Sequence, residues 1–197
     1  MKKKIFITIF FIFGLTFKSL AYSTDPKQFI SEIVEEAKKV LVASNTKEFK
    51  TQKLSEIALK TVDIKGVGFY SLGNYRKKLS EDQLKEYLIL FEKYFLKSFT
   101  SRLTDYSDPK INVISTEVLS EKYTIVKSVL LATDKRPEVK IEWRVYTKNP
   151  EKPLIRDLII EGLSLARTQK EEFASVIETN DGDVNKLFDT LKAFTAK

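Results

Sequence analysis

The spacing of the apolar residues changes along this 197-residue chain, and the change restricts the possible folds more than any other feature. From residue 25 to about residue 103 apolar side chains recur every three or four positions, which indicates amphipathic helices. After Asp108 and Pro109 they recur every second position, which indicates strands. The helical spacing then returns. We therefore expect an α+β fold in which helices pack around a bent antiparallel sheet of about four strands.

The expected helices have local start signals. Asp25 is placed as an N-cap ahead of the first helix. Ser80 and Gln83 match a capping box at the start of the longest helix, which should run for about 25 residues. Thr168 and Glu171 match the same pattern, so we expect another helix to open there.

Four segments carry the strand pattern, at 111–118, 121–134, 137–148 and 154–166. Because short links join them in sequence, an antiparallel meander is the natural topology. The second segment is apolar on both faces, since Ile125 and Val129 alternate with Val126 and Leu130. A sheet with one face in water alternates more cleanly. Either helices cover both faces or an apolar face lines a cavity.

Residues 1–21 have the organisation of a secretory signal peptide. Three lysines precede an apolar run of about 13 residues, and Ser19 and Ala21 supply the small residues of a cleavage site. The run is shorter than a membrane-spanning helix needs, although an uncleaved anchor is the alternative. We expect cleavage after Ala21 and a single exported domain over residues 22–197.

Composition excludes several classes of function for the exported chain. Four of the 34 basic residues and none of the 27 acidic residues lie in the predicted signal peptide, so cleavage lowers the formal net charge from +7 to +3. The remaining charges are interspersed, which argues against a nucleic-acid partner. The chain has no Cys and no His. A disulfide framework is therefore impossible, and the commonest catalytic nucleophiles and metal ligands are missing.

Asp157 and Glu161 are the carboxylates that come closest to a catalytic pair. They are four residues apart in the last predicted strand, so their side chains should point to the same face. One interpretation is an acid and a base in a pocket. The interpretation that we prefer is structural, with the carboxylates paired to Arg144, Arg156 or Arg167 or capping a backbone N–H.

A short basic run, Arg76 to Lys78, follows Tyr75. These cations are suited to a lipid phosphate or to an acidic partner. The simpler interpretation is a solvated helix end, where basic side chains are favourable.

Two segments resemble the MlaC family, also called the toluene-tolerance family. The run LGNYRKKLSEDQLKEYLILFEKYF is similar to the family's LG-x-x-W/Y-R segment and the aromatic-rich helix after it, with Tyr75 where Trp is frequent. The run IRDLIIEGLSLARTQKEEFASVI resembles the family's strand and the helix that follows it. Its matching residues are Asp157, Glu161, Gly162, Ser164 and Phe173.

The resemblance implies a periplasmic carrier that binds the acyl chains of a phospholipid in a cavity between sheet and helices. It implies exchange with an inner-membrane ABC transporter that carries MCE domains and with an outer-membrane lipoprotein–porin complex, which would maintain the lipid asymmetry of the outer membrane. We expect a monomer with no cofactor and no catalytic activity. The alternatives are a hopanoid carrier of the same family, a lipoprotein chaperone, which usually has more strands, and a pocket enzyme that uses Asp157 and Glu161.

The candidate cavity residues come from the aromatic-rich helices and from the strands with the clearest alternation of apolar and polar residues. Either sheet face could line the cavity. The candidates are Phe69, Tyr70, Phe91, Phe95, Val129, Leu131, Val139, Ile141, Trp143 and Val145.

Overall fold

The computed structural model describes residues 21–134 and 136–196, so the predicted signal peptide, apart from its last residue, lies outside the described residues. The helices are α1 (Pro26–Val42), α2 (Lys47–Thr61), α3 (Ile64–Leu72), the 3₁₀ helix η1 (Gly73–Lys77), α4 (Glu81–Leu103), α5 (Leu165–Glu178) and α6 (Val184–Ala196). The strands are β1 (Ile111–Ser120), β2 (Tyr123–Leu130), β3 (Val139–Tyr146), β4 (Leu154–Ile160) and β5 (Leu163–Ser164). Among these helices none has the length and apolar character that a membrane crossing requires.

The sheet is an antiparallel meander in the order β1-β2-β3-β4-β5, which confirms the α+β fold and the topology. It has five strands, one more than the expected number of about four. The predicted strand 154–166 is interrupted by a turn at Glu161 and Gly162, whose φ angles are 49° and 82°. Two successive residues in the left-handed region form the kind of turn that closes a two-residue hairpin. The chain therefore folds back, and Leu163 pairs with Ile160.

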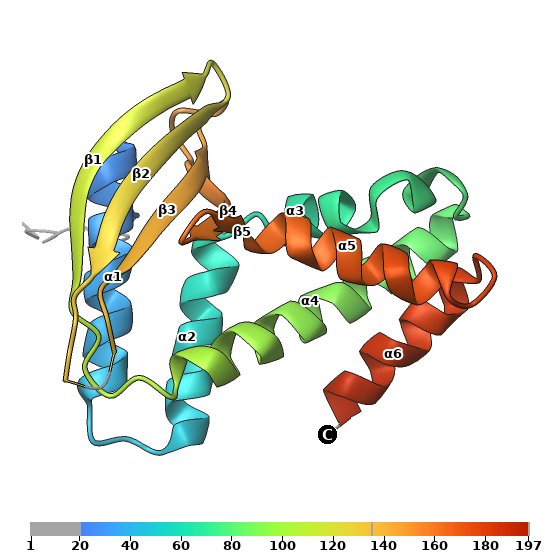
Figure 1. Cartoon of the computed structure of the whole chain (residues 1–197), viewed down its shortest axis with the longest axis horizontal. Coiled ribbons are helices and arrows are strands. Elements are labelled where there is room, and N and C mark those ends of the chain that lie inside the picture. Colours follow the sequence, from blue (N-terminus) through green and yellow to red (C-terminus); the bar gives the residue numbers. More distant parts are fainter. Residues whose placement is uncertain (1–20, 135, 197) are drawn as a thin grey trace, which may run out of the picture.

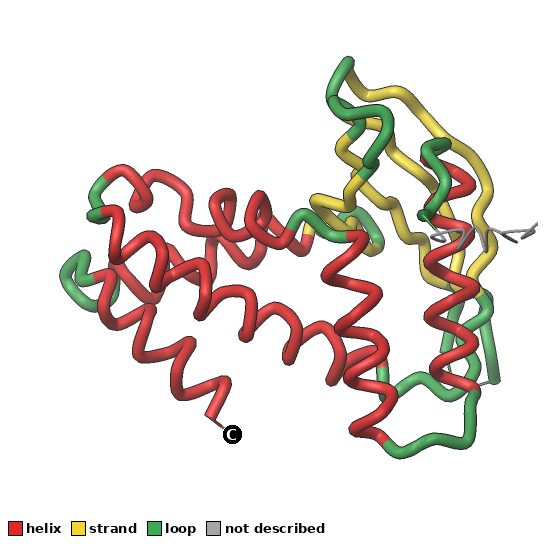
Figure 2. The backbone as a smooth tube through the Cα atoms, turned by 180° about the vertical axis from the view of Figure 1, so that it is seen from behind, coloured by secondary structure: helices red, strands yellow, loops and turns green. Residues whose placement is uncertain are grey.

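The molecule has two halves that lie side by side (Figure 1). In one half the curved sheet packs against α1, with α2 beside it. In the other half α3, α4, α5 and α6 form a layer of helices. Figure 2 shows the same division from behind, with α2 next to the C-terminal end of α4.

The local start signals for α1 and α4 are confirmed. The Asp25 side chain accepts a hydrogen bond from the Gln28 N–H at 2.8 Å, and both hydrogen bonds of the Ser80–Gln83 capping box are present. The expected start of α5 at Thr168 is wrong. Ser164 caps this helix by accepting from the Arg167 N–H at 3.1 Å, and the Thr168 hydroxyl donates to the Ser164 carbonyl inside the first turn.

Each half has its own apolar core. One core lies between α1, α2 and one sheet face, where Phe29, Ile30, Val126 and Val145 are almost fully buried. The other lies among α3, α4, α5 and α6 and includes Tyr87, Phe91, Phe173 and Phe188. Val126 and Val145 lie on the sheet face that α1 covers. Toward β4 the same face points to the space between the two halves.

The helices α3 and α4 approach closely at Gly68. A Cβ atom there would lie 2.8 Å from the Phe91 ring, so only glycine fits without a shift. The Tyr87 hydroxyl donates to the Gly68 carbonyl at 2.9 Å. These contacts fix the position of α4 and therefore of the aromatic stripe that continues along it.

Candidate functional site

A cavity of about 470 Å³ lies where the two halves meet. Its walls come from α1, α2, α4, α5 and the inner face of β3 and β4. Such a volume is typical of pockets that enclose a small organic ligand or part of a larger one. The cavity joins the two cores, so a ligand there would contact both halves of the molecule.

The wall of the cavity is mainly apolar. On the α4 side the large rings of Phe95 and Phe99 line the cavity and remain half-buried. These two rings stack with their centroids 5.8 Å apart. Opposite them the apolar contributors from α1 and α2 are Ile33, Val34, Ala37, Leu41, Leu54, Ile57 and Ala58. The geometry favours a ligand with long apolar parts.

Three cations line this apolar cavity, and one of them, Arg156, is paired with Asp63. Lys38 lies on α1 between the apolar lining residues Val34 and Leu41, and Arg102 lies at the end of the α4 stripe. Within residues 21–134 and 136–196 neither side chain forms an ion pair. Unpaired cations beside an apolar wall provide a place for an anionic group.

The α5 side of the cavity is more polar. The Tyr94 hydroxyl donates to the Gln169 side chain at 2.8 Å, and Gln169 donates to Glu172 at 3.1 Å. Burial raises the pKa of Tyr94, and the Glu172 carboxylate raises it further, whereas Arg102 has the opposite effect. The Tyr94 hydroxyl therefore interacts electrostatically with both Arg102 and Glu172, so a cation and an anion lie near the same part of the cavity.

The comparisons with known proteins agree with this fold. The family model for the MlaC protein matches residues 27–193, which is nearly the whole described chain. The chain belongs to the MlaC family. A solved structure of the phospholipid-binding protein from Ralstonia solanacearum, in complex with a phospholipid, is similar to the fold, with a TM-score of 0.72 and 18% sequence identity. The match covers 89% of this chain and 97% of that one.

Four of the candidate residues lie on the wall of this MlaC-family cavity: Phe91 and Phe95 on α4, and Ile141 and Trp143 on β3. The indole N–H of Trp143 donates to the Ser128 hydroxyl at 2.8 Å, which satisfies the one polar atom of the Trp side chain. The ring can therefore serve as an apolar surface.

The other six candidates lie elsewhere. Val145 is fully buried in the core against α1, and Val139 is half-buried at the start of β3. Val129 alternates with Leu130, which lines the cavity, so it points to the opposite face. Leu131 follows the end of β2. Phe69 and Tyr70 lie on α3 beneath Lys65 and Lys170 on the outer surface.

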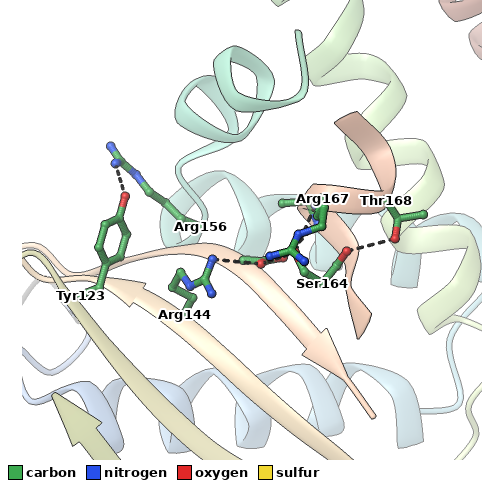
Figure 3. Close-up of polar contacts among 8 residues, drawn as sticks. Tyr123, Arg144, Arg156, Ser164, Arg167 and Thr168 are labelled. Atoms are coloured by element: carbon green, nitrogen blue, oxygen red, sulfur yellow. Dashed lines mark hydrogen bonds and ion pairs between the residues drawn. The ribbon is translucent and has the colours of Figure 1, made fainter. Parts of the chain in front are cut away.

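Asp157 and Glu161 do not form the expected pair on one face. Glu161 lies in the turn after β4, where its exposed carboxylate accepts from the Lys140 N–H. Asp157 is 6% exposed and lies at the boundary of the cavity. It accepts from the Ser164 hydroxyl at 2.6 Å and the Ala166 N–H at 2.9 Å, and Arg144 lies 3.5 Å away. Figure 3 shows Arg144 and Ser164 converging on this site. The carboxylate fixes the start of α5.

Arg156 connects the two halves. Its guanidinium donates to Asp63, the N-cap of α3, at 2.7 Å. The same guanidinium donates to the Tyr123 hydroxyl at 2.9 Å (Figure 3). It also lies 3.6 Å from the centroid of the Tyr146 ring. The Asp63 N–H donates to the Ile155 carbonyl at 2.9 Å beside these contacts. They hold β4 against α3 at one end of the cavity.

The sequence analysis missed the α1 and α2 walls. A signal was present in α1, where Lys38 occupies a position within the stripe that Val34, Ala37 and Leu41 form at helical spacing. A charged residue inside an apolar stripe indicates a face that does not pack against a dry core. Among the described residues no cluster of acidic side chains has an arrangement that could hold a metal ion.

Proposed function

We propose that this member of the MlaC family is a lipid carrier that holds the acyl chains of a phospholipid in the cavity between its two halves. The observation that carries the proposal is the apolar cavity of about 470 Å³ with two unpaired cations on its wall. The similar protein from Ralstonia solanacearum, which was solved in complex with a phospholipid, supports the same ligand class.

The physical need for a carrier is large. Each methylene of an acyl chain costs about 0.8 kcal/mol when it is exposed to water, so two chains of ordinary length cost roughly 20 kcal/mol. A phospholipid therefore leaves a bilayer at a useful rate only when an apolar surface replaces the one that it gives up. The rings of Phe95, Phe99 and Trp143 provide such a surface, and lipid transfer of this kind requires no nucleophile or metal.

The cations distinguish a phospholipid from the alternatives. Lys38 and Arg102 would bind a phosphate, and a hopanoid without phosphate would leave Lys38 without a counter-charge on the cavity wall. The pocket-enzyme alternative gains nothing from the geometry, because both oxygens of Asp157 accept hydrogen bonds from Ser164 and Ala166 and Glu161 lies in an exposed turn.

The setting of this carrier is part of the proposal. Residues 22–197 act as one monomeric lipid-binding domain in the periplasm after cleavage of the signal peptide. The carrier exchanges phospholipid with an inner-membrane ABC transporter that carries MCE domains and with an outer-membrane lipoprotein–porin complex. The family membership supports this setting.

A transfer experiment tests the carrier activity. Fluorescent phospholipid in donor vesicles is mixed with unlabelled acceptor vesicles, and the rate of transfer is measured with increasing amounts of the mature protein. We expect a rate that rises in proportion to protein concentration. A rate equal to that of the vesicles alone would overturn the proposal.

A further inference from the structure

The outer surface around α3, η1 and α5 has a different chemistry from the cavity. Residues 64–80 contain four basic side chains and no acidic one. Two further cations come from α5, which packs beside α3 (Figures 1 and 2). We name this surface the basic face and define it by its cations: Lys65, Arg76, Lys77, Lys78, Arg167 and Lys170.

The contacts bring the basic face together across three elements. The Lys170 ammonium lies 5.5 Å from the centroid of the Tyr70 ring, and its side chain packs against Gly73, at the start of η1. Lys65 lies over Phe69 at 5.7 Å, and Lys78 lies over Tyr75 at 5.3 Å. The cations are therefore held next to aromatic rings rather than scattered along the chain.

The charge of the basic face is not neutralised locally. All six of its cations are exposed, and none of them belongs to an ion pair in the described part of the chain. Acidic side chains also lie on α5 (Glu171, Glu172 and Glu178) and at the start of α4 (Glu81 and Asp82), and Asp63 before α3 is paired with Arg156. Glu178 accepts a hydrogen bond from the Tyr75 hydroxyl. Residues 64–80, which supply four of the six cations, contain no carboxylate, so this part of the surface has a net positive charge.

We propose that the basic face docks the protein on an anionic membrane surface. Lysine and arginine next to an anionic bilayer each contribute to binding, and amphipathic aromatic side chains such as Tyr70, which is 46% exposed, are favourable at the level of the lipid headgroups. The six cations and the exposed ring match both requirements. Phe69 and Tyr70 lie outside the cavity wall, so this role goes beyond lipid binding in the cavity and does not depend on it.

Sedimentation with vesicles tests the docking. The mature protein is mixed with vesicles of phosphatidylcholine alone or of phosphatidylcholine with phosphatidylglycerol. We expect binding to the anionic vesicles only. The triple variant R76Q/K77Q/K78Q should bind them on the order of 100-fold more weakly, because each cation contributes about a factor of 5. Raising the ionic strength to about 1 M, where the Debye length is about 3 Å, should abolish binding by the unchanged protein.

A matched control removes the same charge from the other half of the molecule. Lys122, Lys148 and Lys152 are exposed and lie in the links that join β1 to β2 and β3 to β4, away from the basic face. The variant K122Q/K148Q/K152Q should bind anionic vesicles as the unchanged protein does. Thermal unfolding of both variants checks that each is folded.

Two results would overturn the inference. One is equal loss of binding in the two triple variants, which would show that only the overall charge matters. The other is no binding of the unchanged protein to anionic vesicles at low salt, which would leave an acidic protein as the partner of the basic face. Native mass spectrometry of the same samples separates this failure from failure of the proposed function, because a bound lipid in the cavity is detected whether or not the protein docks.

Discussion

The Ser164 hydroxyl donates a hydrogen bond to the Asp157 carboxylate at 2.6 Å, and this contact joins β4 to the start of α5. Ser164 also accepts from the Arg167 N–H as the cap of α5, so one hydroxyl serves both elements. The pair fixes the direction in which α5 leaves the sheet and thereby the position of one cavity wall.

Replacement of Asp157 should destabilise the fold strongly. Asp157→Ala removes the acceptor for Ser164 and Ala166 and leaves Arg144 without its anion. Removing one partner of a buried ion pair lowers the free energy of unfolding by about 3–5 kcal/mol. Because Arg144 is partly exposed, we expect a loss near the lower end of this range. Urea unfolding measures the loss. The exposed Asp105 provides the control, since Asp105→Ala should change stability by no more than about 0.5 kcal/mol.

Filling the cavity should reduce lipid binding without loss of the fold. Ala37 lines the cavity from α1 and is half-buried. A Phe ring there that displaces only two methylenes of a ligand costs about 1.6 kcal/mol, or more than tenfold in affinity. Ala193→Phe on the exposed surface of α6 is the matched control. Equal lipid affinity of Ala37→Phe and Ala193→Phe would show that the ligand does not occupy this cavity.

Removal of the Lys38 charge should affect phospholipids selectively. A charge-assisted hydrogen bond contributes about 1.5–3 kcal/mol, so Lys38→Gln should lower phospholipid affinity roughly 10- to 100-fold. Diacylglycerol, which has no phosphate, should bind equally well to both proteins. Lys39→Gln changes the neighbouring exposed lysine and should have no effect. Competition between the two lipids measures the selectivity, and a parallel loss for both would contradict a phosphate contact.

Alkaline pH should destabilise the protein through Tyr87. Burial raises the pKa of its hydroxyl, which donates to the Gly68 carbonyl. Above about pH 10 the unfolded chain loses this proton while the folded protein keeps it, so stability falls with rising pH by about 1.4 kcal/mol per pH unit for this group. Below pH 10 the contribution of Tyr87 is fully present.

The variant Tyr87→Phe isolates this effect. At pH 8 it should be less stable by about 1 kcal/mol, because the Gly68 carbonyl loses its partner. Between pH 10 and pH 11 its stability should fall less than that of the unchanged protein. Urea unfolding at these pH values compares the two proteins, and identical slopes would show that Tyr87 does not remain protonated in the folded state.

Local signals in the sequence predicted the parts of the fold that depend on neighbouring residues. The Ser80–Gln83 capping box is satisfied within one turn, so its sequence pattern is sufficient. The start of α5 was not predictable in this way. Thr168 and Glu171 match the same pattern, but the buried Asp157 holds Ser164 and Ala166 at an earlier start. That choice depends on tertiary contacts.

The candidate site was predictable only in part for a similar reason. The aromatic stripe of α4 is long enough to predict that Phe91 and Phe95 face something large. On the short helix α3, the sequence does not show which partner each ring meets, and Tyr70 lies under Lys170 of α5 rather than at the cavity. Lys38 was overlooked because a single lysine in a helix is usually solvated, whereas here it lines an apolar wall.

The most direct test of the account is native mass spectrometry of the mature protein purified from cells, followed by organic extraction and lipid analysis. The account predicts one adduct per protein that extracts as a diacyl phospholipid and is lost from Ala37→Phe but not from Ala193→Phe. A protein that carries no lipid, and takes up none from labelled vesicles, would contradict it.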